Sequence, residues 1–314
     1  MRLLSIGEVM IEMSGGWHGS SESEAWRLGF AGDTLNTLWY VRAGLDPERD
    51  EASYFTTLGD DGFSDRIAEF LGSNGIEIGA IRRIPGKRPG LYLIEQKDGD
   101  RRFTYWRDTS AARQLADDED ALRQAIASAD CIYLSGITLA ILPAAGRALL
   151  VDLCGEANSA GKTVAFDPNI RPALWSGLED AREAVMRLAA AATIVLPSFD
   201  DETAVFGDAD PQTTIERYRA AGVAEIAVKN GPHAIAFCSN DEEGTVDALP
   251  NVKPVDATGA GDSFNGAYLG ARLTGASMRE AVEAGRDMAA RVVGVHGALA
   301  DFADPSGRWS AKRG

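Results

Sequence analysis

The sequence predicts an α/β fold built around a mainly parallel sheet. Its middle and C-terminal parts alternate short apolar or β-branched runs with longer helix-like segments. Strands that are separated by helices pair in parallel through right-handed crossovers, which gives a layered sandwich. A second observation is a hairpin pattern between residues 91 and 106, which interrupts this alternation. We therefore expect an α/β core that carries a small β-sheet of its own.

The elements of the core follow from these runs. Strands are expected at 131–135, 163–167, 193–196 and 225–229. Helices are expected between them, at 143–160, 179–191 and 211–221, and Gly161 and Gly222 follow the first and last of these as C-terminal caps. An earlier helix ends before Gly75, and its predicted apolar face consists of Phe63, Ile67, Phe70 and Leu71.

The small sheet is predicted from two stretches that do not read as helix. The segments 91–96 and 101–106 flank the sequence Lys-Asp-Gly-Asp at 97–100, a strong hairpin signal. The stretch 10–30 also looks extended. We interpret residues of about 10–31 and 86–109 as a discontinuous β lid over the core, within one domain of residues 1–314.

The composition of the chain argues against several classes of partner and of location. The 314 residues carry 31 basic and 47 acidic side chains, a formal charge of −16, which argues against nucleic acid and anionic membranes as partners. No apolar stretch approaches membrane-spanning length. Cys131, Cys154 and Cys238 are widely spaced and odd in number, as expected for reduced buried thiols. We expect a cytoplasmic protein.

The most informative stretch is Asp-Ala-Thr-Gly-Ala-Gly-Asp-Ser-Phe-Asn-Gly at 256–266. Small residues expose the backbone just before a helix that is expected to run from Asp262 towards Leu273. Free amides and the positive end of the helix dipole form an anion site there. A carboxylate at Asp262, beside that site, suits the deprotonation of a hydroxyl next to a phosphoryl group. An N-capping Asp after a glycine turn is the structural alternative.

This stretch resembles the C-terminal signature of the ribokinase-like (PfkB) carbohydrate kinases. The sequence Gly-Phe-Ala-Gly-Asp-Thr-Leu-Asn at 29–36 resembles their N-terminal sugar-binding element, and the order of elements agrees over nearly the whole chain. Within the family, the chain is most similar to the branch whose substrate is the keto-sugar acid 2-keto-3-deoxygluconate. That similarity is carried by residues 7–12, 31–37, 91–92, 103–107, 133–137 and 167–172.

The resemblance implies a ribokinase-like three-layer α/β/α sandwich and a set of site residues. Asp262 is expected as the catalytic base, with the amides of Gly259, Ala260 and Gly261 as the anion hole. Substrate contacts are expected from Gly32, Asp33, Asn36, Tyr92, Tyr105, Arg107 and Arg171, in addition to Asp262.

The residues themselves support part of this set. Asp33 and Asn36 can hold vicinal hydroxyls, and Arg107 can hold a carboxylate through two parallel hydrogen bonds. Tyr105 and Arg107 are two residues apart and are expected on one face of a strand. Arg171 could instead pair with Asp167, and Asp33 could simply cap a helix.

ATP and Mg²⁺ are the implied cofactors, with a monovalent cation also possible in the family. Nucleotide contacts are expected from Asn169, Ser198, Lys229, Gly231, Gly259, Ala260 and Gly261. The chain departs from the family pattern at two places: Ala234 replaces the last glycine of the Lys-x-Gly-x-x-Gly loop, and Ser198 and Asp201 replace the usual Asn and Glu. Asp201 is the one candidate metal contact, and it could also belong to a solvated helix start.

The expected activity is ATP-dependent phosphorylation of the terminal hydroxyl of 2-keto-3-deoxygluconate. Fructose, ribose or a keto-deoxy-galactonate remain alternative acceptors. A non-catalytic sugar-binding regulator is a further alternative, and it predicts loss of the base or of the anion hole. Exposed lid strands and the family resemblance suggest a homo-oligomer, a dimer or larger.

Overall fold

The structure, a computed structural model, describes residues 1–15, 26–97 and 100–300. An eight-stranded sheet with the order β14-β13-β12-β11-β10-β9-β1-β4 runs through the molecule. All neighbouring pairs from β4 to β12 are parallel, whereas β13 and β14 add an antiparallel edge. The expected mainly parallel sheet is confirmed.

The strands of this sheet are β1 (Arg2–Ile6), β4 (Glu51–Phe55), β9 (Cys131–Ser135), β10 (Thr163–Asp167), β11 (Ile194–Val195), β12 (Glu225–Val228), β13 (Ile235–Cys238) and β14 (Glu243–Val246). The helices are α1 (Asp33–Gly44), α2 (Gly62–Ser73), α3 (Glu119–Ser128), α4 (Gly136–Ile141), α5 (Ala144–Ser159), α6 (Leu178–Ala190), α7 (Phe199–Phe206), α8 (Pro211–Ala220), α9 (Ala260–Leu273) and α10 (Met278–Val292). A short parallel pair is formed by β5 (Thr57–Leu58) and β6 (Arg82–Arg83).

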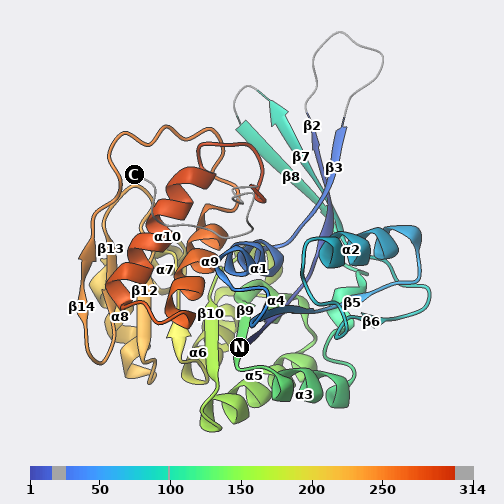
Figure 1. Cartoon of the computed structure of the whole chain (residues 1–314), viewed down its shortest axis with the longest axis horizontal. Coiled ribbons are helices and arrows are strands. Elements are labelled where there is room, and N and C mark those ends of the chain that lie inside the picture. The colour runs from blue at the N-terminus through green and yellow to red at the C-terminus, as the bar shows by residue number, and fades with distance from the viewer. Residues whose placement is uncertain (16–25, 98–99, 301–314) are drawn as a thin grey trace.

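The central sheet is buried on both faces, because its strands alternate between two apolar cores. Along β9, Ile132 and Leu134 pack into the core shared with α3, α5 and α6, whereas Cys131 and Tyr133 pack into the core shared with α1, α2, α9 and α10. Helices thus cover both faces, as the three-layer expectation requires (Figure 1).

A separate four-stranded sheet projects from one end of this body (Figure 1). Its order is β3-β2-β7-β8, with β2 (Met10–Gly15), β3 (Trp26–Ala31), β7 (Leu91–Lys97) and β8 (Asp100–Trp106). The hairpin β7–β8 is antiparallel, and β2 joins it in parallel. This sheet is the predicted lid. Residues 16–25, which were predicted to belong to the lid, residues 98–99 of the predicted hairpin turn, and residues 301–314 lie outside the described residues.

Three sequence expectations need correction. The helix that carries Asp262 begins at Ala260, two residues earlier than expected, because Gly259 in the left-handed region ends the preceding turn. Phe63 is 39% exposed, so the buried face of α2 is narrower than predicted. Strands β4, β5, β6 and β14 and helices α3, α4 and α10 lie where no element was predicted.

The expected caps are confirmed. Gly75, Gly161 and Gly222 all have positive φ, at 71°, 82° and 95°, which a residue with a side chain rarely adopts. Among the described helices, none is both long and apolar enough to cross a membrane.

Candidate active site

Two cavities meet where helix α9 begins. The first, here called the lid cavity, has a volume of about 830 Å³ and lies between the lid, the start of α1, the ends of the parallel strands and the start of α9. The second, the outer cavity, has a volume of about 720 Å³ and lies between the segment after β12, residues 248–254 and the helices α9 and α10. Both cavities are lined by Ser198, Lys229, Ala257, Ala260 and Gly261.

The turn before α9 has a backbone that only glycine fits. Gly259 has φ 76°, and a Cβ atom there would lie 2.9 Å from the Cα of Ala298. The carboxylate of Asp256 fixes the turn, because it accepts hydrogen bonds from the amides of Thr258 and Gly297, each at 2.8 Å. The predicted glycine turn is therefore held rigidly at the entrance of the helix.

This turn brings backbone amides to the junction of the cavities. The Ala260 amide already donates to the carbonyl of Ala257 at 3.2 Å, whereas the amides of Gly259 and Gly261 make no such bond within the described part of the chain. Together with the positive end of the α9 dipole, these amides can hold an anion. Of the three predicted anion-hole residues, Gly259 and Gly261 are the better placed to donate.

Asp262 lies in the first turn of α9 and lines the lid cavity. Its Oδ2 accepts a hydrogen bond from the Asn36 amide at 2.8 Å. Burial, and after it the negative charge of Asp33, raise the pKa of Asp262 to about 7, although the Asn36 hydrogen bond and the Lys229 charge each lower it. A carboxyl group with this pKa can take up a proton near neutral pH.

The start of α1 faces Asp262 across the lid cavity. A Cβ at Gly32 would lie 2.1 Å from the carbonyl oxygen of Glu8, so only glycine lets α1 begin this close to β1. Asp33 accepts a hydrogen bond from the Asn169 amide at 2.8 Å, and burial raises the pKa of Asp33. The predicted group Gly32, Asp33 and Asn36 is thus assembled on the cavity wall opposite α9.

The lid contributes an aromatic wall. Tyr92 and Tyr105 pair across the β7–β8 hairpin, with ring centroids 5.7 Å apart, and Phe103 stacks on Tyr105 at 6.2 Å. All three side chains line the lid cavity, and Tyr105 remains 50% exposed. The Tyr92 hydroxyl donates to the carboxylate of Glu12 on β2, which fixes the ring. Phe103 was not predicted as a site residue.

Arg107 lies just beyond the end of β8 and is buried. The structure pairs it with the buried carboxylate of Glu8, a contact that the sequence did not suggest. Its guanidinium lies 5.9 Å from the centroid of the Tyr105 ring, and both residues line the lid cavity. The second carboxylate oxygen of Glu8, Oε1, has no hydrogen-bond partner among the described residues. A buried acceptor of this kind can receive a hydroxyl from a ligand.

Arg171 lies past the end of β10, with half of its side chain exposed towards the lid cavity. It donates to Asp201 Oδ2 at 3.2 Å and to the carbonyl of Ile170 at 3.0 Å. The alternative in which Arg171 pairs with Asp167 is wrong, because Asp167 is paired with Lys229.

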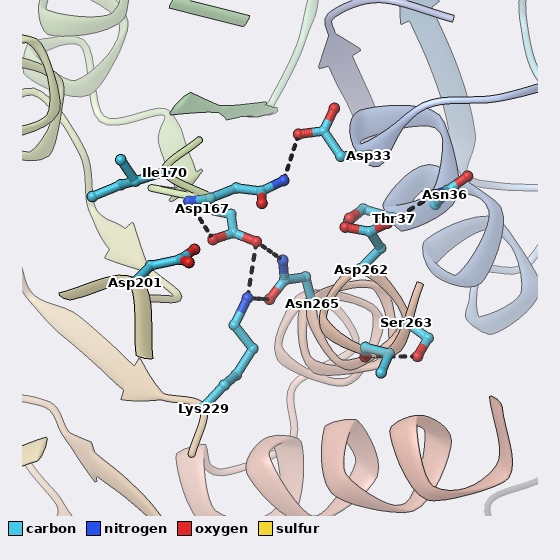
Figure 2. A network of polar contacts seen from close by, with 12 residues as sticks. Asp33, Asn36, Thr37, Asp167, Ile170, Asp201, Lys229, Asp262, Ser263 and Asn265 are labelled. Carbon is cyan, nitrogen blue, oxygen red and sulfur yellow. Dashed lines mark hydrogen bonds and ion pairs between the residues drawn. The ribbon is translucent and has the colours of Figure 1, made fainter. Parts of the chain in front are cut away.

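A buried polar network links the strand ends to α9 (Figure 2). Lys229 donates to Asp167 Oδ2 at 2.8 Å and to Asn265 Oδ1 at 3.0 Å. The Asn265 amide donates to the same Asp167 oxygen at 2.6 Å and to the Tyr133 hydroxyl at 3.2 Å. Because parallel strands carry their ligands beyond their C-terminal ends, this network lies where an α/β sheet forms its site.

The outer cavity is lined by some of the predicted nucleotide contacts and by apolar side chains. Gly231, with φ 51°, and Ser198 line it, as predicted for nucleotide contacts. Asn169 instead lines only the lid cavity, where it holds Asp33. Ala234, the departure from the glycine loop, lines neither cavity. The remaining walls are mostly apolar and include Leu249, Val252, Pro254, Phe264, Ala289, Ala290 and Val293.

The candidate metal contact is not supported by a cluster of ligands. Over the described ranges, no group of three His, Cys, Asp or Glu residues could hold a metal ion. Asp201 lines neither cavity, and its carboxylate is engaged by Arg171. Mg²⁺ commonly keeps several waters and binds through substrate phosphates, so an all-protein cage is not required.

Sequence reasoning missed Glu8, Asn265 and the role of Asp167. Asn265 follows Asp262 by three residues on the same helix, a spacing that places the two on neighbouring faces. This spacing was the available signal. Glu8 lies two residues after the first strand, at the edge where a parallel sheet binds its ligands.

Comparison with known proteins agrees with this geometry. The family model described as "pfkB family carbohydrate kinase" matches residues 1–304. The 2-dehydro-3-deoxygluconokinase of Dickeya dadantii is 38% identical over 300 residues, which cover 94% of this chain and 95% of that protein.

Solved structures show the same fold. A PfkB protein from Polaromonas has a TM-score of 0.81 at 27% identity, over 94% of this chain and 96% of that one. A putative ribokinase II from E. coli, solved in complex with ATP and Mg²⁺, has a TM-score of 0.79 at 23% identity, over 95% and 94% of the two chains. The chain belongs to the pfkB family of carbohydrate kinases.

Proposed function

We propose that this kinase transfers the γ-phosphoryl group of ATP to the terminal hydroxyl of 2-keto-3-deoxygluconate. The products are 2-keto-3-deoxy-6-phosphogluconate and ADP. The observation that carries the reaction type is the position of Asp262, a carboxylate with a pKa near 7 beside free helix-start amides at the junction of two cavities. The substrate assignment is supported by the relative from Dickeya dadantii and by the arginines of the lid cavity.

The sugar occupies the lid cavity in this proposal. Asp33 and Asn36 hold its hydroxyls, and the terminal hydroxyl points to Asp262. As the sugar oxygen bonds to the γ-phosphorus, its proton passes to the Asp262 carboxylate, and the bond from phosphorus to the bridging oxygen of ADP breaks. The free amides at Gly259 and Gly261 stabilise charge on the transferred group.

The nucleotide occupies the outer cavity, where apolar walls hold the base and Ser198, Lys229 and Gly231 lie near the phosphates. Mg²⁺ neutralises phosphate charge when it is bound, and we assign its ligands to the nucleotide phosphates and water. Asp201 is the one carboxylate we retain as a candidate, acting through water. Asn169 contributes from the sugar side, through its hydrogen bond to Asp33.

The acid end of the substrate is assigned to Arg107 and Arg171. Both guanidinium groups line the lid cavity, and Tyr92 and Tyr105 form the wall beside Arg107. Arginine matches a carboxylate through two parallel hydrogen bonds, which a neutral ketose cannot form. The chain as a whole carries a charge of −16, so an anionic substrate needs such a local positive site.

Asp262→Asn tests the base assignment. The amide keeps the size and the hydrogen-bonding capacity of the side chain but cannot accept the proton, so turnover should fall by about 10³-fold. ADP release measures turnover, and calorimetric titration with 2-keto-3-deoxygluconate measures sugar affinity, which should change by less than about threefold. Near-normal turnover would exclude Asp262 as the base.

Two alternatives remain in view. A kinase for fructose, ribose or a keto-deoxy-galactonate would keep the same machinery and change only the acceptor. A non-catalytic sugar-binding regulator would have no need for the base, yet Asp262 and the glycine turn are intact. ADP release that depends on sugar separates the kinase from the regulator.

We also infer a homo-oligomer assembled through the lid. The β8 edge of this sheet is exposed, and Trp106 on it is 55% exposed, which favours association between copies of the chain. Light scattering of the purified protein measures the molecular mass directly. A cytoplasmic location is inferred from the ATP requirement and from the three buried free thiols.

A further inference from the structure

Lys229 has a position that a nucleotide-binding loop alone does not require. It follows β12 directly, is only 8% exposed, and is the one cationic residue that lines both cavities in the described part of the chain. A Cβ atom placed on Gly261 would lie 3.6 Å from its Nζ. The ammonium group therefore lies beside the turn that starts α9, next to the proposed anion hole.

The ammonium group is held there by two buried side chains. Asp167, 3% exposed, and Asn265, fully buried, accept two of its three N–H bonds, and they are also hydrogen-bonded to each other. The other oxygen of Asp167 accepts a hydrogen bond from the backbone N–H of Asn169 at 3.1 Å. This arrangement leaves one N–H of Lys229 without a hydrogen-bond partner among the described residues.

A purely structural role is the competing explanation. A buried carboxylate needs a partner, and Lys229 could serve only to neutralise Asp167. That explanation does not account for the position of the pair at the cavity junction, nor for Gly261, which carries no side chain to separate the ammonium from the helix start.

We propose that Lys229 is a catalytic residue that binds the phosphoryl group in transit, and that Asp167 and Asn265 are positioning residues for its ammonium. This inference rests on the proposed function. Lys229 gives up no proton in this step. It donates its third N–H to an oxygen of the transferred phosphoryl group while the bond to ADP breaks and the bond to the sugar oxygen forms. An ammonium in a site that excludes water stabilises such charge strongly.

The three buried groups also set the environment of Asp262. The negative charge of Asp167 raises the pKa of Asp262, and the positive charge of Lys229 lowers it. Removing Lys229 alone should therefore raise the pKa of Asp262. Removing both charges should leave it closer to its wild-type value.

The test uses Lys229→Met and the double variant Asp167→Asn/Lys229→Met. The single variant leaves a buried carboxylate unpaired and should be less stable, whereas the double variant removes both charges and should recover stability. Lys162→Met is the matched control, because Lys162 lies just before β10, at the opposite end of that strand from Asp167, and lines neither cavity.

The first readout is the kcat of ADP release with 2-keto-3-deoxygluconate. We expect a loss of about 10²-fold or more in both the single and the double variant, with the control within about twofold of wild type. Recovery of the double variant to within about threefold of wild type would overturn the proposal, because Lys229 would then serve only to neutralise Asp167.

The second readout does not depend on the sugar. Calorimetric titration of the double variant with ADP and with a non-hydrolysable β,γ-imido analogue of ATP compares a nucleotide that lacks the γ-phosphoryl group with one that carries it. We expect the analogue to bind about tenfold more weakly than to wild type and ADP to bind equally well. Equal changes for both nucleotides would refute contact with the transferred group. A wild-type protein that is inactive on 2-keto-3-deoxygluconate would overturn the proposed substrate, while this titration would still decide the role of Lys229.

Discussion

At the scale of single residues, the site depends on carboxylates held close together. Asp33 and Asp262 face the same cavity, and burial raises the pKa of each. Such crowding keeps a proton on the pair at a pH where free aspartate is ionised. Because the proposed base must lose this proton before it can act, the reaction rate should depend on pH.

The pH dependence of kcat/KM follows from this. Asp262 acts only when deprotonated, and the raised pKa of about 7 means that activity should climb with pH through neutrality and level off above pH 8. Initial rates of ADP release between pH 5 and 9, at sugar concentrations below KM, measure this limb. An acid limb below pH 5, where ordinary aspartate titrates, would contradict the assignment.

The variant Asn36→Ala tests whether Asp262 is the group that titrates near pH 7, because it should shift the pH profile in a known direction. The Asn36 amide donates to Asp262 and lowers its pKa, because the bond favours the charged form. Its loss should move the acid limb of kcat/KM to higher pH. If the pH at which kcat/KM falls were unchanged in this variant, the group that titrates near pH 7 would not be Asp262.

Arg107→Ala tests the acid-binding side of the lid cavity. The substitution should cost about 10²-fold or more in kcat/KM on 2-keto-3-deoxygluconate, because a charge-assisted contact to the carboxylate is lost. On fructose, which has no carboxylate, the loss should stay below about tenfold. Because Glu8 would be left unpaired in the variant, Arg107→Ala/Glu8→Gln controls for that cost. Equal losses on both sugars would remove the carboxylate argument.

At this scale, the sequence could predict site residues that belong to local motifs, but not contacts between residues far apart in the chain. The glycine turn, Asp262 and Asp33 are local patterns and could be assigned directly. The contacts Asn36–Asp262, Arg107–Glu8 and Lys229–Asp167 join residues 226, 99 and 62 positions apart, and no local pattern indicates such pairs. For the same reason the pairing of Arg171 could be framed only as an open alternative.

At the scale of elements, the packing of α9 against α1 places the proposed base, Asp262, opposite the proposed sugar-binding residues Asp33 and Asn36. Close approach is possible because Gly266 faces α1: a Cβ there would lie 2.5 Å from the Tyr40 Cβ and 2.6 Å from the Thr37 carbonyl oxygen. Asp262 and Asn36 lie on these two helices and are joined by a hydrogen bond. The glycine that ends the Phe-Asn-Gly sequence at 264–266 is thus required for the packing of α9 against α1.

Gly266→Ala should separate the two helices. Overpacking of a buried contact costs about 1–3 kcal/mol, and the shift of Asp262 away from its partner should lower kcat as well. Thermal unfolding followed by circular dichroism, together with ADP release, measures both effects.

Gly155→Ala is the control for this substitution. A Cβ at Gly155, in the interior of α5, would meet only the Ala191 Cβ, at 3.9 Å. Replacing such a helical glycine should stabilise the protein by about 0.5–1 kcal/mol. If Gly266→Ala behaved in the same way, the packing account of α1 and α9 would be incorrect.

Helices and strands were predicted correctly where the apolar residues follow a clear helical or strand periodicity. Strands β9 and β10 match the expected runs, and α5, α6 and α8 begin and end within about one residue of expectation. Strand β14 was missed, because its sequence Glu-Gly-Thr-Val contains a single large apolar residue. Phe63 was placed on the buried face of α2 by spacing alone, and tertiary packing leaves it exposed.

At the scale of the whole molecule, the fold separates two binding spaces and joins them at a single point. The lid sheet supplies the aromatic and arginine wall of one cavity, and the loops beyond β12 together with α9 and α10 enclose the other (Figure 1). The start of α9 lies between them. The proposed function requires that the phosphoryl group pass from the nucleotide to the sugar across this junction. The proposed carboxylate contacts in the lid cavity determine which sugar accepts it.

The most direct test is the ratio of kcat/KM for 2-keto-3-deoxygluconate to that for fructose, measured by coupled ADP release with the wild-type protein. A site built to pair a carboxylate with arginine should favour the keto-sugar acid by about 10³-fold or more. A ratio near one, a preference for fructose, or no sugar-dependent ADP release would contradict the account.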